Sequence, residues 1–60
     1  MDAKIICMID DLSRFALFGL LDYPAFTADS NDYLRSAVRE RLESGNLSDH
    51  DIVAAWEGDE

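Results

Sequence analysis

Few side chains in this 60-residue chain are of types that carry out chemistry, and their spacing matches no familiar catalytic or metal-binding arrangement. Cys7 is the only cysteine and His50 is the only histidine. A nucleophile needs a neighbouring base, and a zinc site needs several Cys or His ligands. The chain also has no glycine-rich phosphate loop. We therefore expect no catalytic residues, no metal ligands and no cofactor, and we predict that the protein is not an enzyme.

Carboxylates are the dominant charged groups, with thirteen Asp and Glu against five Lys and Arg and a formal net charge of -8. Residues 43–60 contain acids but no Lys or Arg. These acids lack the ligand spacing and central glycine of a calcium-binding EF-hand loop. One interpretation is that they keep a small domain in solution and complement a helix N-terminus. The other is an acidic face that docks on a basic surface of a partner, formed by Glu43, Asp49, Asp51 and Glu57.

The basic residues Arg35, Arg39 and Arg41 raise an alternative function, a DNA-binding regulator with a helix-turn-helix. In that motif the second helix enters the major groove. Here the second helix would present Asp49, Asp51 and Glu57 to the phosphates. Because DNA affinity depends largely on neutralising phosphate charge, nucleic acid is the less favoured partner. Arg35 and Arg39 are more simply the solvated face of a helix, where Arg39 is spaced to pair with Glu43.

Arg41 stands apart because it falls within an otherwise apolar helical stripe. Its aliphatic stem can cover the core while the guanidinium reaches helix-end carbonyls or water. Alternatively, it forms an ion pair across a subunit interface with Asp10 or Asp11 and so fixes the register of a dimer. The sequence leaves both interpretations open.

The elements that position these side chains are predicted to be three helices, covering residues 3–21, 30–44 and 49–57, in one all-α domain of residues 1–60. Tyr23-Pro24 ends the first helix, because the residue before proline avoids helical geometry. Asp29 or Ser30 is the expected N-cap of the second, and Gly45 suits its left-handed C-cap. Ser48 and Asp51 match a capping box for the third.

The apolar run from Phe15 to Leu21 predicts association. A chain this short buries only about 60% of the surface that its unfolded form exposes. A continuous helix has one apolar side, formed by Ile5, Met8, Ile9, Leu12, Phe15, Ala16, Gly19 and Leu20. The run also extends apolar character to the opposite side, which Asp10, Asp11 and Arg14 occupy one turn earlier. We therefore expect a helical homodimer whose self-association interface contains Leu17, Phe18 and Leu21.

The aromatic side chains are expected to serve the core. Trp56 is the natural anchor of the third helix, and Phe26 is placed to plug one end of the core. Tyr23 and Tyr33 can bury their rings while their hydroxyls stay in water. Residues 58–60 have nothing to bury and are expected to fray.

No membrane or export segment is predicted. The apolar stretch that follows Lys4 is cut short by Asp10 and Asp11, and the next one stops at Asp22, far below the roughly 20 residues that span a bilayer. A single reduced thiol at Cys7 fits a cytoplasmic location.

A general resemblance follows from the short, acidic, single-domain character of the chain and from a sequence that ends with Trp56-Glu57-Gly58-Asp59-Glu60. In these respects the chain resembles the small helical accessory proteins of temperate phages. Such proteins commonly bind host factors, so the resemblance implies a role in modifying host physiology. It assigns no functional residues. The expected function is a small non-catalytic protein that self-associates and binds or modulates an unidentified protein partner.

Overall fold

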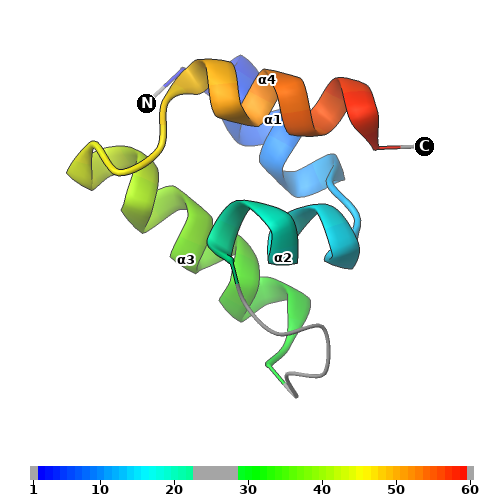
Figure 1. The fold of residues 1–60 in the computed structure, drawn as a ribbon. Helices are drawn as coiled ribbons and strands as arrows, with labels where there is room; N and C mark the ends of the chain where they lie inside the picture. Colours follow the sequence, from blue (N-terminus) through cyan, green and yellow to red (C-terminus); the bar gives the residue numbers. More distant parts are fainter. Residues whose placement is uncertain (1, 23–28, 60) are drawn as a thin grey trace.

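The computed structural model describes residues 2–22 and 29–59, which form four helices (Figure 1). These are α1 (Ala3–Asp11), α2 (Arg14–Leu21), α3 (Asn31–Ser44) and α4 (Asp49–Gly58). The described residues contain no strand, so the all-α prediction is confirmed. The predictions for Tyr23, Pro24 and Phe26 concern residues outside the described ranges.

The predicted single helix over residues 3–21 is wrong, because the chain breaks between α1 and α2. Leu12 and Ser13 both have extended backbone, with ψ of 140° and 163°. The Ser13 hydroxyl accepts a hydrogen bond from the backbone N–H of Ala16 at 3.3 Å, which makes Ser13 the N-cap of α2. Serine is among the best N-cap residues, so the break has a local cause in the sequence.

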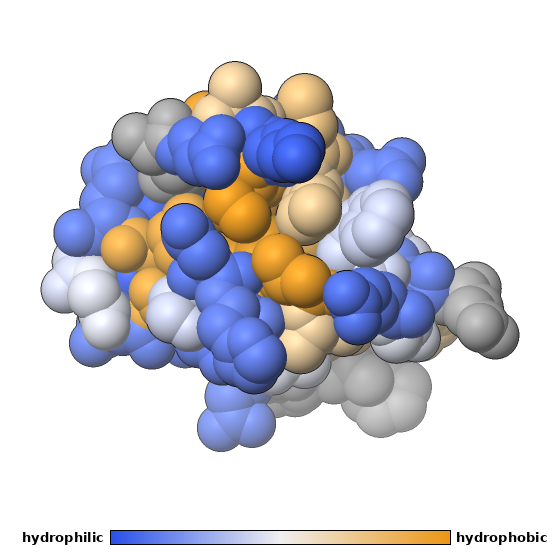
Figure 2. Space-filling view, turned by 90° about the horizontal axis from the view of Figure 1, so that it is seen from above, coloured by the Kyte–Doolittle hydropathy of each residue, from blue (hydrophilic) through white to orange (hydrophobic). Residues whose placement is uncertain are grey.

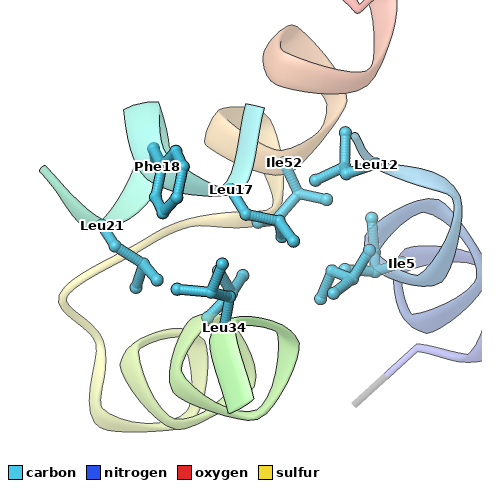
Figure 3. Close-up of a cluster of buried hydrophobic side chains, with 9 residues drawn as sticks. Ile5, Leu12, Leu17, Phe18, Leu21, Leu34 and Ile52 are labelled. Atoms are coloured by element: carbon cyan, nitrogen blue, oxygen red, sulfur yellow. The ribbon is translucent and has the colours of Figure 1, made fainter. Parts of the chain in front are cut away.

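This break redirects the apolar run into the protein's own core. α3 packs mainly on α2, α4 packs mainly on α1, and each also contacts the other member of the α1–α2 pair. Side chains of all four helices turn toward one centre (Figure 3). The buried core consists of Ile5, Ile9, Leu12, Leu17, Phe18, Leu21, Leu34, Val38 and Ile52.

Leu17, Phe18 and Leu21 therefore do not form a self-association surface. Their exposed fractions are 0%, 6% and 1% within a single chain. The interface prediction assumed that one continuous helix presents these residues opposite the Ile5 and Ile9 stripe. With the break, α2 has its own direction and buries them against its own neighbours.

The predicted caps of the two later helices are confirmed. Ser30 caps α3 by accepting a hydrogen bond from the N–H of Tyr33 at 3.2 Å, and Gly45 ends it with a φ of 89°. Ser48 and Asp51 form the capping box of α4, in which the Ser48 N–H donates to the Asp51 carboxylate at 2.9 Å. α4 begins at the predicted residue and ends at Gly58, one residue after the predicted end.

Within the described ranges, none of the helices has the length and apolar character needed to cross a membrane.

Candidate functional site

Two arginines of α3 bind backbone carbonyls next to the two ends of α2. The Arg35 guanidinium donates to the carbonyl of Leu12 at 3.4 Å, at the break before α2. The Arg41 guanidinium donates to the carbonyl of Leu21 at 3.1 Å, in the last turn of α2. A cation at a helix C-terminus also interacts favourably with the helix dipole. Both side chains therefore serve to dock α3 on the break and on α2.

The ion pair of Arg41 with Asp10 or Asp11 was predicted across a subunit interface and stays a prediction, since the structure is a single chain. Arg41 is occupied by the Leu21 carbonyl, which agrees with the alternative that its guanidinium reaches a helix end. The helix end belongs to α2 rather than to Arg41's own helix. Asp10 instead pairs with Arg39 at 3.4 Å, so Arg39 does not take the predicted partner Glu43.

Arg14, at the start of α2, also points back onto its own chain. Its guanidinium donates to the side chain of Asn31 at 2.8 Å and lies 4.9 Å from the centroid of the Phe18 ring. Together with Arg35, Arg39 and Arg41, it completes the set of four arginines in the sequence. Each arginine thus contacts groups of the same chain while remaining partly exposed.

The four acids predicted to form one face fall into separate groups. Glu43 and Asp49 lie close together and, with Asp2 and Leu42, line a hollow of about 210 Å³. Asp51 is used by the capping box, and hydrogen bonds from the backbone and then the hydroxyl of Ser48 lower its pKa from the ordinary value of 3.8. Glu43, Asp49 and Asp51 are all exposed, and the Asp51 carboxylate also accepts the cap hydrogen bonds.

Glu57 belongs to a second acidic group at the other end of α4. With Asp11, Trp56 and Asp59 it lines a hollow of about 380 Å³. The hollow lies between α4 and Asp11 of α1. Seen from above, the molecule has apolar side chains in a strip flanked by hydrophilic ones (Figure 2). The acidic surface thus extends along α4 in two patches, with α1 contributing to both.

Trp56 is not the core anchor that the sequence predicted. It is 40% exposed, and its indole N–H donates to the carboxylate of Asp11 at 3.3 Å. Ile52, one turn earlier, is completely buried and anchors α4 instead. Trp56 lies beside Cys7 and Met8 at a hollow of about 530 Å³ between α1 and α4. Cys7 is a free, exposed thiol.

Asp59, one of the terminal residues predicted to have nothing to bury, is hydrogen-bonded to the break before α2. Its carboxylate accepts hydrogen bonds from the Ser13 hydroxyl at 2.6 Å and from the Ser13 N–H at 2.8 Å. These two bonds lower the pKa of Asp59 from its ordinary value of 3.8. The sequence does not predict this contact, because the predicted helix over residues 3–21 includes Ser13 and leaves no break there. Glu60 is outside the described residues.

Phe15 is the most exposed of the large apolar side chains that the structure describes, at 78%. It was predicted to continue the inward stripe of the first helix, but the break at Ser13 turns it outward. Phe15 stands at the edge of a groove between α2 and α4. This groove is the apolar surface that sequence reasoning missed.

Comparison of the chain with family models, curated proteins and solved structures gave no match. The described residues contain no group of three or more His, Cys, Asp or Glu side chains placed to hold a metal ion. A functional proposal therefore rests on the charge distribution and on the exposed apolar groups.

Proposed function

We propose that this protein is a small non-catalytic binding protein that forms a homodimer and docks its acidic surface on a basic surface of another protein. The observation that carries the proposal is the excess of carboxylates on α4 and next to it: residues 43–60 contain six Asp and Glu but no Lys or Arg. The four arginines contact groups in other parts of the chain. A surface of one sign attracts a partner of the opposite sign and accelerates encounter with it.

The exposed aromatic rings support a binding role. Phe15, Tyr33 and Trp56 are 78%, 55% and 40% exposed. Aromatic residues are enriched at the energetic centres of protein interfaces, where they bury large area at low cost in side-chain entropy. Trp56 lies next to the acidic group of Asp11 and Glu57, so an apolar anchor and two carboxylates are available at one place.

The alternative of a helix-turn-helix DNA-binding regulator has less support. α3 and α4 pack on α1 and α2 and make few contacts with each other, whereas a helix-turn-helix needs the second helix held on the first. The arginines that would bind phosphates are those that dock α3 on α1 and α2. The resemblance to small phage accessory proteins adds the hypothesis that the basic partner is a host factor.

The proposal is tested by fluorescence anisotropy with two labelled probes, a lysine-rich peptide and a random DNA duplex. We expect the peptide to bind at low salt and to weaken as sodium chloride is added, because screening shortens the range of the attraction. We expect the duplex not to bind. Tight, salt-sensitive binding of the duplex, or no binding of the peptide, would overturn the proposal.

A pair of matched variants separates the acidic surface from net charge alone. D49N/E57Q removes two carboxylates from α4, whereas D22N/E40Q removes two carboxylates from other helix positions. None of these four side chains is part of a cap hydrogen bond, and asparagine tolerates the left-handed backbone of Asp22. Binding of the peptide should weaken more in D49N/E57Q. Equal weakening in both variants would mean that no particular surface is recognised.

A further inference from the structure

We propose that the groove between α2 and α4 binds a second copy of this chain, with Phe15 of each copy inserted into the groove of the other. This inference rests on the homodimer of the proposed function and names its surface. That surface replaces the one assigned to Leu17, Phe18 and Leu21, which are buried.

The groove is open and mostly apolar. It measures about 420 Å³, more than one phenyl ring fills, and small side chains form much of its wall. A β-carbon added at Gly19 or at Gly58 would meet no atom within 4 Å, so both positions face open space. The groove is lined by Phe15, Ala16, Gly19, Leu20, Ala54, Ala55, Gly58 and Asp59.

Phe15 supplies the projection that such a groove accepts. It lies one helical turn before Gly19 on α2, at the groove's edge, and exposes 78% of its surface. The projecting ring and the receiving groove therefore lie on the same face of the molecule. A two-fold axis beside this face places each Phe15 over the partner's groove and pairs identical surfaces, as a closed dimer requires. The face is thus complementary to itself.

The charge distribution favours a second copy over a basic partner at this face. Residues 12–21 contain no Asp or Glu, in a chain with thirteen. The only carboxylate among the groove residues is Asp59, which is bonded to Ser13. Two chains of net charge -8 repel each other least where their carboxylates are fewest. A basic partner finds one carboxylate among the groove residues, that of Asp59, and is attracted more strongly to the acidic patches.

The size of the face indicates a weak dimer. A standard stable interface buries about 800 Å² on each partner. Such an area would be a large part of the 3991 Å² surface of this chain. Because α2 and α4 have only 8 and 10 residues, we expect the interface between two copies to be smaller than this standard area. The dimer should therefore dissociate on dilution, which makes its affinity measurable.

Sedimentation equilibrium of the whole protein, at concentrations from about 1 µM to 1 mM, tests the inference. We expect a monomer–dimer equilibrium. Phe15→Ala removes the projection and Gly19→Leu fills the groove, so each should raise the dimer Kd by about tenfold or more. Tyr33→Ala truncates another exposed aromatic ring on α3, away from the groove, and should change Kd by less than about twofold.

Added salt gives an independent readout. Screening reduces the repulsion between two acidic copies, so the dimer should tighten with sodium chloride, whereas binding of the lysine-rich peptide should weaken. Circular dichroism confirms that each variant is folded. A dimer that Phe15→Ala and Gly19→Leu leave unchanged would overturn the groove assignment while the homodimer stands. A monomer at every concentration would overturn both the groove assignment and the homodimer. Binding of the lysine-rich peptide by the acidic surface would still be decided by the anisotropy experiment.

Discussion

The carboxylate of Asp59 is bonded to both the hydroxyl and the N–H of Ser13, at 2.6 and 2.8 Å, across 46 residues of sequence. Ser13 is also the N-cap of α2. A single contact thus fixes the break between α1 and α2 and holds the end of α4 beside it. Phe15 and the groove lie next to this contact, since Phe15 follows Ser13 by two residues and Asp59 lines the groove.

Replacement of Ser13 by alanine should destabilise the protein by about 1–2 kcal/mol. The substitution removes the hydroxyl, which accepts the N-cap hydrogen bond from Ala16 and donates to Asp59, and leaves only the backbone N–H to bind Asp59. Urea unfolding followed by circular dichroism measures the loss. Ser36→Ala on the exposed side of α3 is the control and should lie within about 0.5 kcal/mol of the parent protein. Equal values for both variants would mean that the Ser13 cap contributes nothing.

Asp59 should also make stability depend on pH in acid. The Ser13 hydrogen bonds lower the pKa of Asp59 in the folded protein below the ordinary value of 3.8. The stabilisation is therefore complete above pH 3.8 and is lost as the pH falls through the lowered folded pKa. Because other carboxylates titrate in the same range, the quantity to compare is the difference between the parent protein and D59N. That difference should shrink in this window. A difference that is independent of pH would contradict the role of the Asp59 charge.

Leu17→Ala should cost about 2–5 kcal/mol, because Leu17 is completely buried in the core. A chain of this size has a total stability of only about 3–9 kcal/mol, so the variant should be largely unfolded near 37 °C. Thermal unfolding by circular dichroism measures this loss. Phe15→Ala, two residues earlier but on the surface, should unfold near the temperature of the parent. If Leu17→Ala remained fully stable and only changed the oligomeric state, the core position of Leu17 would be wrong.

Arg41→Met keeps most of the aliphatic stem of Arg41 but removes the hydrogen bond to the Leu21 carbonyl. We expect a loss of about 1–2 kcal/mol, as is typical when a hydrogen bond to a charged group is removed at a partly buried site. Arg39→Met removes the surface ion pair with Asp10 and should cost under about 1 kcal/mol. Chemical unfolding of the two variants side by side gives the comparison, and the reverse order would contradict the docking role of Arg41.

The parts of the fold that the sequence predicted are those decided by short-range chemistry. Ser30, Gly45 and Ser48 act within one helical turn of themselves, so their cap roles follow from residue type and position. The inward positions of Ile5 and Ile9 follow from helical periodicity in the same way. These features needed no knowledge of the partner helices.

The parts that were missed are the break at Ser13, whose cap is local but is masked by the apolar periodicity, and the contacts between residues distant in sequence. Ser13 has no glycine or proline beside it, and apolar residues recur on both sides of it at helical spacing. Periodicity alone therefore favoured one long helix. On one long helix Leu17 faces outward and Phe15 inward, so the predicted interface contained residues that are buried in the core. The pairs Arg39–Asp10 and Asp59–Ser13 join separate helices, so no local spacing could reveal them.

The packing of α4 on α1 has a consequence for how the protein is made. The apolar side of α1 and α2 cannot be fully covered until Ile52 has been synthesised, because α4 supplies part of the core. While the nascent chain is shorter than this, Ile9 and Leu17 remain available to chaperones or to other exposed apolar chains. Folding of this domain is therefore completed only after α4 has been synthesised.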